Sequence, residues 1–229
     1  ENIELRAADQ QKDKIIATVA HELRTPINAT LGLLDMAGER IEDEMTQTFL
    51  KHAKSCNKLL LYLVNSILDL SQIKQNTLSI LKENFSVDEF LQELEFLYMF
   101  QCQAKGIQFF IERDVLIPKQ IYTDRHRLIE ILINLIGNAL KFTFEGSVET
   151  TARKHSEYIQ FRVTDTGTGI KEEDQEKLFK MYGRLDQENP NTNTQGVGFG
   201  LEISNQLAML LCEGQDGGIK FNSQVGKGT

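Results

Sequence analysis

His21-Glu22-Leu23-Arg24-Thr25-Pro26 lies early in an amphipathic pattern that predicts a helix over residues 3–39. Because each helical residue turns by about 100°, Arg24 and Thr25 should lie on roughly the same face as His21. The opposite face carries apolar residues at steps of three or four: Ile16, Ala20, Leu23, Ile27 and Leu34. We therefore expect the His21 imidazole to point to solvent, with the Glu22 carboxylate following it directly in the sequence.

The His21-Glu22 pair has a chemical interpretation and a structural one. A neutral imidazole nitrogen is a competent nucleophile, and a neighbouring carboxylate can fix its tautomer and disperse charge as it reacts. The alternative is a surface histidine on a coiled-coil helix, which is the commoner role for a lone histidine. The rest of the chain has to decide between them.

A second helix is predicted over residues 45–75, after a polar turn at 39–44. Its apolar positions also recur at steps of three and four: Phe49, Ala53, Cys56, Leu60, Leu63, Ile67 and Leu70. Two helices with one narrow apolar seam each bury little surface alone. We expect an antiparallel hairpin that forms a homodimer, and hence a four-helix bundle. A monomeric coiled-coil hairpin is the alternative.

Composition limits the classes of function. The net charge is −8, from 33 acidic and 25 basic side chains, and without a basic run a nucleic-acid partner is not expected. The three cysteines fit neither a metal site nor a disulfide framework, so we expect core positions and a cytoplasmic setting. The longest apolar run, residues 59–64, is too short to cross a bilayer. The chain begins without methionine, and we expect an excised fragment with a membrane or sensor region upstream.

The second part of the chain has mixed periodicity. Ser86 begins a predicted helix over residues 87–104, and Asp124 caps a strongly apolar one. Alternating apolar residues predict strands at 107–112, 147–153, 158–164 and 219–222. Because both hairpins and helices join these strands, we expect an α+β protein. An all-α hairpin over residues 1–76 should precede a two-layer α/β sandwich with a mixed sheet over residues 77–229.

The predicted helix after Asp124 carries Asn134 and Asn138 on one face, one turn apart, with Lys141 three residues later. Amide oxygens facing a cleft can ligate Mg²⁺, a hard ion that bridges phosphates, and a lysine is a natural phosphate contact. The alternative is a pair of satisfied polar residues where the helix meets a loop.

Two glycine-rich stretches follow. Asp165-Thr166-Gly167-Thr168-Gly169 comes directly after a predicted strand, where glycines permit the close approach of a flat ligand and an aspartate can accept a hydrogen bond from an amino group. Such sequences are also common in turns. Gly196-Val197-Gly198-Phe199-Gly200-Leu201 ends a polar loop at residues 184–196 and begins a helix, an arrangement that can cradle phosphate oxygens under a mobile lid.

These motifs, in this order, resemble the transmitter core of a two-component sensor histidine kinase over essentially the whole chain. The stretch at 21–26 matches that family's phosphoacceptor box, and Asn134–Thr143 resembles its asparagine box. The stretches at 165–169 and 196–201 are similar to its two glycine boxes. The chain departs from the family pattern at Val197 and Phe199 of the second glycine box. It also departs at Met181-Tyr182, where the family has a further characteristic stretch called the aromatic box. These departures put the rate of lid movement and the turnover of ATP in question.

The resemblance implies a dimerisation hairpin joined to an ATP-binding domain of the type shared with gyrase and certain chaperones. It implies that His21 accepts the γ-phosphoryl group of ATP, that Glu22 orients or deprotonates the imidazole, and that Thr25 positions water for a reverse phosphatase activity. The implied nucleotide contacts are Mg²⁺ on Asn138 and Asn134, adenine on Asp165, phosphate charge on Lys141 and Arg184, and a pocket and lid shaped by Gly167, Gly169, Gly196, Gly198 and Gly200.

The implied partner is an aspartate on a response-regulator receiver domain. A second hypothesis, motivated by Val197 and Phe199, is a nucleotide-gated signalling module with little or no kinase activity. A third, a purely structural dimeric coiled coil, leaves the glycine-rich loops unexplained.

Overall fold

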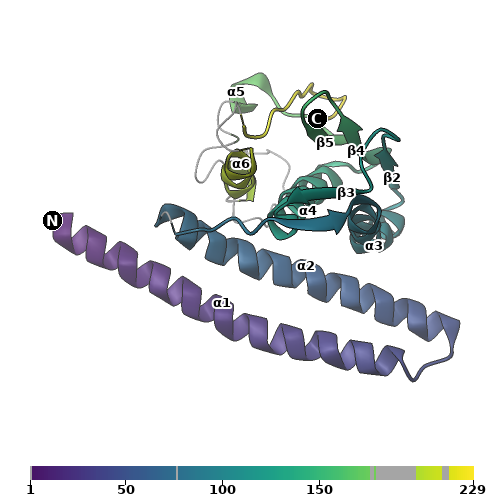
Figure 1. Ribbon diagram of the computed structural model, residues 1–229, viewed down its shortest axis with the longest axis horizontal. Helices are drawn as coiled ribbons and strands as arrows, with labels where there is room; N and C mark the ends of the chain where they lie inside the picture. Colours follow the sequence, from purple (N-terminus) through teal and green to yellow (C-terminus); the bar gives the residue numbers. More distant parts are fainter. Residues whose placement is uncertain (1, 76, 176–177, 179–199, 213–216) are drawn as a thin grey trace. The chain divides into compact units, whose positions relative to one another are not determined.

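The computed structural model describes residues 2–75, 77–175, 178, 200–212 and 217–229 (Figure 1). The chain divides into two compact units, Glu1–Ser79 and Ile80–Thr229. The first unit is a hairpin of α1 (Asn2–Gly38) and α2 (Glu44–Lys74), as the amphipathic patterns predict. The Asp43 carboxylate caps α2 by accepting a hydrogen bond from the Thr46 backbone N–H at 2.7 Å.

The hairpin core uses a different face of α2 from the one that the sequence pattern favours. Its buried side chains are Ala20, Ile27 and Val64, with Leu31, Leu61 and Leu68 packed around them. Five of the seven α2 residues expected in the seam are instead exposed in this chain: Phe49, Cys56, Leu60, Leu63 and Ile67. On α1, Leu23 is also 45% exposed. Because the buried positions on α2 are shifted by one residue from the exposed ones, α2 has two apolar faces, and α1 covers one of them.

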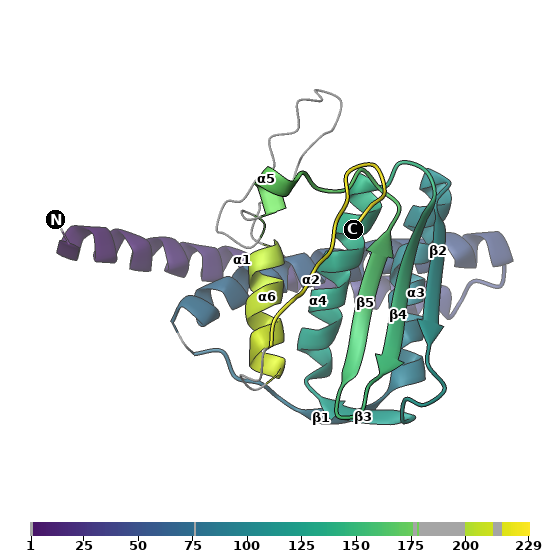
Figure 2. The ribbon, with the colours of Figure 1, turned by 90° about the horizontal axis from the view of Figure 1, so that it is seen from above.

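The second unit is built from two sheets and a layer of helices (Figure 2). Its elements are β1 (Glu83–Ser86), α3 (Val87–Lys105), β2 (Gln108–Arg113), β3 (Gln120–Thr123), α4 (Arg125–Phe142), β4 (Ser147–Lys154), β5 (Ile159–Asp165), α5 (Glu172–Gln175) and α6 (Gly200–Leu211). In the larger sheet β2 pairs with β4 in parallel and β4 pairs with β5 antiparallel, whereas β1 and β3 form a separate antiparallel pair. The mixed sheet and the α+β class are confirmed.

Helices α3 and α4 cover one face of the larger sheet, and α6 packs beside α4 (Figure 2). The core between the layers contains Phe90 and Leu94 of α3, Ile129 and Ile136 of α4, and Val148 of β4, all with exposed fractions of zero. Two bonds join α3 to the backbone of α4. The buried Tyr98 hydroxyl donates to the carbonyl of Ile133 at 2.5 Å, and Lys105 Nζ donates to that of Leu140 at 2.6 Å.

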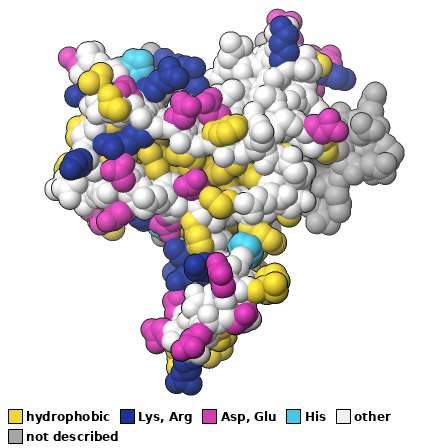
Figure 3. Space-filling model, turned by 90° about the vertical axis from the view of Figure 1, so that its right-hand side faces the viewer, with side chains coloured by type: hydrophobic (Ala, Val, Ile, Leu, Met, Phe, Trp, Pro, Cys, Tyr) yellow, Lys and Arg dark blue, Asp and Glu magenta, His cyan; other side chains and the backbone are white. Residues whose placement is uncertain are grey.

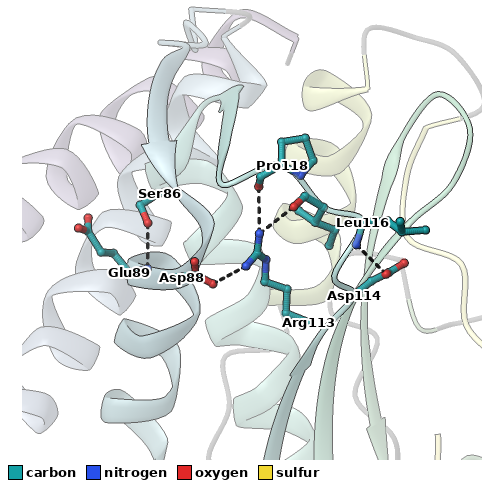
Figure 4. A network of polar contacts seen from close by, with 8 residues as sticks. Ser86, Asp88, Glu89, Arg113, Asp114, Leu116 and Pro118 are labelled. Atoms are coloured by element: carbon teal, nitrogen blue, oxygen red, sulfur yellow. Dashed lines mark hydrogen bonds and ion pairs between the residues drawn. The ribbon is translucent and has the colours of Figure 1, made fainter.

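Polar contacts fix the turn between β2 and β3 (Figure 4). Arg113, the last residue of β2, binds Asp88 at the start of α3 at 2.8 Å and the Ile117 carbonyl at 2.7 Å. The neighbouring Asp114 accepts the Leu116 backbone N–H, which lowers the pKa of this carboxyl. The end of the sheet is therefore tied to α3 by one guanidinium.

Three expectations need correction. The predicted strand at 219–222 is irregular chain, whose Ile219 N–H donates to the Asn205 side chain rather than to a neighbouring strand. Conversely, β1 and β3 were not predicted. The cysteines also differ: Cys102 is buried in α3, and burial raises its pKa to about 11, but Cys56 and Cys212 are exposed. Cys56 lies on the face of α2 that α1 leaves uncovered.

Candidate functional site

The His21 side chain is 72% exposed on α1, as its place opposite the apolar residues predicts. Its Nδ1 lies 3.9 Å from Glu22 Oε1, within ion-pair range but beyond hydrogen-bond length. The Thr25 hydroxyl donates to the His21 carbonyl at 3.4 Å, which keeps Thr25 beside the histidine. Because Nδ1 faces the carboxylate, Nε2 is the ring nitrogen left for an incoming electrophile.

The asparagines of α4 have different environments. Asn134 Nδ2 donates to the Ser204 hydroxyl of α6 at 2.8 Å, and a Cβ on Gly200 would overlap the Asn134 side-chain oxygen. Gly200 therefore packs directly against the Asn134 amide. Asn138 is half-buried one turn further along, and its amide forms no hydrogen bond with the described residues. At the end of the helix, Lys141 Nζ lies 5.1 Å from the centre of the Phe142 ring.

Asp165 ends β5 and is anchored on two sides. Its Oδ1 accepts the Gly167 backbone N–H at 2.8 Å, and its own N–H donates to the Thr229 carbonyl at 2.9 Å. Burial raises the pKa of Asp165, and hydrogen bonds to its carboxylate from the backbone of Gly167 and Thr229 act in the opposite direction. The Gly167 N–H occupies only Oδ1, so Oδ2 can accept a further hydrogen bond.

The loop after Asp165 lies against backbone on both sides. Thr168 N–H donates to the Phe142 carbonyl at 3.2 Å, and Gly226 N–H donates to the Thr168 carbonyl at 2.8 Å. A Cβ on Gly167 would lie 2.5 Å from the Phe142 oxygen. Gly169 has a φ of +66°, and a Cβ there would overlap the Gln224 carbonyl. These two glycines are needed because no side chain fits between the loop and its neighbours.

The structure brings two groups of the predicted residues together: Asp165, Gly167 and Gly169 at the end of α4, and Asn134 with Gly200. His21, Glu22 and Thr25 belong to the first unit. Arg184, Gly196 and Gly198, with the departures at Met181, Tyr182, Val197 and Phe199, lie outside the described residues. Sequence analysis missed three contacts: Asn65 to Arg24, Ser204 to Asn134, and the C-terminal turn at 224–228. The closely spaced Gly226 and Gly228 were the available signal for that turn.

The oxygen atoms of Asn134 and Asn138 suit an ion such as Mg²⁺, which also binds substrate phosphates, better than they suit an ion coordinated by protein side chains alone. In the part of the chain that is described, no group of three or more His, Cys, Asp or Glu side chains could hold an ion. Mg²⁺ is commonly bound by one or two protein oxygens together with substrate phosphates. The uncommitted amide of Asn138 and the Oδ1 of Asn134, whose Nδ2 is engaged, could supply such oxygens.

Family models match both units. Residues 11–76 match the His Kinase A (phospho-acceptor) domain, and residues 123–229 match the histidine kinase-, DNA gyrase B- and HSP90-like ATPase. The chain belongs to the sensor histidine kinase family. It is 33% identical to the aerobic respiration control sensor protein ArcB of Escherichia coli over 98% of this chain and 28% of that protein. It is 34% identical to the autoinducer 2 sensor kinase/phosphatase LuxQ of Vibrio parahaemolyticus, over 99% and 26% respectively.

A solved structure is similar to this chain over most of its length. The crystal structure of full-length ShkA in complex with AMPPNP aligns with a TM-score of 0.63 and 26% identity, over 94% of this chain and 44% of that one. The present chain therefore spans under half of ShkA and under a third of the two curated relatives. None of the described helices is long and apolar enough to cross a membrane.

We predict that Gly169→Ala destabilises the second unit far more than Gly106→Ala. Both glycines have a positive φ, +66° and +71°, so alanine should cost about 1 to 2 kcal/mol of backbone strain at either position. At Gly106 nothing lies within 4 Å of the added Cβ, whereas at Gly169 overlap with Gln224 should add about 1 to 3 kcal/mol. Urea unfolding of the two variants measures this difference. Equal losses would show that the loop does not depend on this close contact.

Proposed function

We propose that this member of the sensor histidine kinase family is an ATP-dependent protein-histidine autokinase that phosphorylates His21. The observation that carries the proposal is the exposed imidazole, whose Nδ1 faces the Glu22 carboxylate while Nε2 is left open. A surface histidine on a coiled-coil helix would also be exposed, but it would not need an acid facing Nδ1. The family assignment supports the same function for this segment.

The proposed transfer uses Nε2 of neutral His21 as the nucleophile. Its lone pair forms the N–P bond to the γ-phosphorus as the bond from that phosphorus to the bridging oxygen breaks, and ADP leaves with the electron pair. Glu22 orients the imidazole and accepts or stabilises the proton at Nδ1 as positive charge develops on the ring. Positioning and charge neutralisation should supply most of the rate enhancement.

We propose the second unit, our predicted domain at 77–229, as the ATP-binding domain. Asp165 would accept a hydrogen bond from the adenine amino group through Oδ2, because Oδ1 already accepts one from the Gly167 N–H. Lys141 and Arg184 would offset phosphate charge, and Gly196, Gly198 and Gly200 would shape the lid. Mg²⁺, held by Asn138 and Asn134, would neutralise charge on the phosphates when bound.

The hairpin, our predicted domain at 1–76, is proposed as the dimerisation domain. Its uncovered α2 face carries Phe49, Leu60 and Leu63, which are 63%, 47% and 60% exposed in the single chain. Hydrophobic side chains also lie at the surface of the turn end of the hairpin (Figure 3, bottom). A second copy placed against this face would complete a four-helix bundle and bury it.

We propose that phosphorylated His21 passes its phosphoryl group to an aspartate of a receiver domain, and that Thr25 positions water in a phosphatase reaction. The LuxQ relative is named a kinase/phosphatase. The Thr25 hydroxyl lies beside the His21 backbone and is exposed, so that a partner and its water could reach both residues.

The function is tested by incubating the native chain and His21→Gln with Mg²⁺ and γ-labelled ATP. We expect an acid-labile, alkali-stable label on the native chain alone, because phosphohistidine is labile in acid. ATP binding without any label would favour the nucleotide-gated signalling module. Equal labelling of both proteins would exclude His21 as the acceptor.

We predict that Asp165→Asn abolishes ATP binding without unfolding the domain. Asn keeps the acceptor for Gly167, but it places an NH₂ donor against the adenine amino group.

The same variant tests the burial of Asp165. Because burial raises the pKa of Asp165, the protonated carboxyl stabilises the folded state at low pH, and this stabilisation is lost as pH rises through the folded-state pKa. Asp165→Asn should therefore be at least as stable as the native chain at pH 7 and lose this advantage in acid. Calorimetric titration with ATP and pH-dependent unfolding measure both effects. Unchanged affinity would disprove the adenine contact.

We predict that Leu63→Glu dissociates the dimer, because it places a charge in the proposed interface. Gln72→Glu is the control, since it adds the same charge at an exposed position of α2 away from that face. Sedimentation velocity should find a monomer for the first variant and a dimer for the second. A native chain that sediments as a monomer at high concentration would contradict the interface.

A further inference from the structure

Arg24 is the only lysine or arginine between residues 15 and 38. The stretch of α2 at residues 59–73 carries neither residue type. These two stretches pack against each other through the hairpin core. Arg24 is therefore the one cation that the hairpin's own sequence supplies at this level, three residues after His21.

The side chain of Arg24 is held across the hairpin. Its Nη2 donates to Asn65 Oδ1 of α2 at 2.8 Å, and the residue is half-buried. A guanidinium has five N–H donors, and those of Arg24 make no other hydrogen bond with the described residues. Residues three apart on a helix have Cβ atoms about 5 to 6 Å from each other, so this cation is a neighbour of the phosphoacceptor.

The chemistry of Asn65 is as informative as its position. An amide oxygen orients a guanidinium without cancelling its charge, whereas a carboxylate in the same place would neutralise it. A phosphoryl group on His21 adds negative charge beside the Glu22 carboxylate, and this local repulsion needs a cation to offset it. Arginine suits the task because its fork of donors matches phosphate oxygens and because it stays protonated.

We propose that Arg24 contacts the phosphoryl group at His21 during transfer, and that Asn65 is a positioning residue that holds Arg24 for this contact. The proposal rests on the proposed autokinase function. Arg24 neither gains nor loses a proton in the step, in which the N–P bond forms as ADP departs.

The experiment compares Asn65→Asp, Arg24→Lys and Arg24→Gln with the native chain. The initial rate of labelling from γ-labelled ATP is measured over a range of ATP concentrations, and thermal unfolding is followed for each protein. Asn65→Asp is the discriminating variant. It preserves the link across the hairpin as an ion pair, so a merely structural role for Asn65 predicts a native rate.

We expect Asn65→Asp to lower kcat by roughly tenfold and Arg24→Gln by about 100-fold, the scale of losing one donor to developing charge. Arg24→Lys should fall between the native chain and Arg24→Gln. The KM for ATP should stay unchanged, because the proposed nucleotide contacts lie in the other unit.

A native kcat for Asn65→Asp would overturn the positioning role of Asn65, and a native kcat for Arg24→Gln would overturn the phosphoryl contact. Reduced rates explained wholly by lower melting temperatures would also overturn the proposal. Absence of label on the native chain would instead contradict the proposed function itself.

Discussion

The carbonyl of Phe142, at the end of α4, is the point on which the candidate nucleotide site depends. Thr168 N–H donates to it, and Gly167 lies so close to it that a Cβ would clash. The loop that carries Asp165 is thereby fixed to the helix that carries Asn138. The C-terminal turn holds the same loop from its other side through Gly226. Adenine and phosphate contacts in such a site would be preorganised by backbone hydrogen bonds, which need no reordering when a nucleotide binds.

In the proposed function the two units divide the chemistry between them. The hairpin exposes His21, the proposed nucleophile, with the Glu22 carboxylate, the Thr25 hydroxyl and the Asn65-held Arg24 on neighbouring residues. A phosphoacceptor must be accessible to a nucleotide and to a receiver domain, so its exposure is a requirement of the function. The hairpin buries only a small apolar core between its two helices. It leaves a second apolar face uncovered, which is the face proposed to bind another copy of the chain.

Local signals in the sequence were sufficient for the long helices, the three strands of the mixed sheet and the caps at Ser86 and Asp124, because periodicity and capping are short-range properties. They failed for β1 and β3, which pair residues such as Phe85 and Ile121 across a whole helix and strand. The strand at 219–222 was wrong because its apolar alternation meets a side chain, Asn205, instead of a strand edge. Among the site residues, the glycines were found by motif, but their physical cause, contact with Phe142 and Gln224, is non-local.

The most direct test of this account is to identify which nitrogen of which histidine becomes phosphorylated. The native chain would be incubated with Mg²⁺ and ATP, digested under alkaline conditions, and analysed by mass spectrometry and phosphorus–proton correlation NMR. The 3.9 Å approach of Nδ1 to Glu22 predicts a phosphoryl group on Nε2 of His21. A phosphoryl group on Nδ1, or on a residue other than His21, would contradict the assignment of nucleophile and orienting acid.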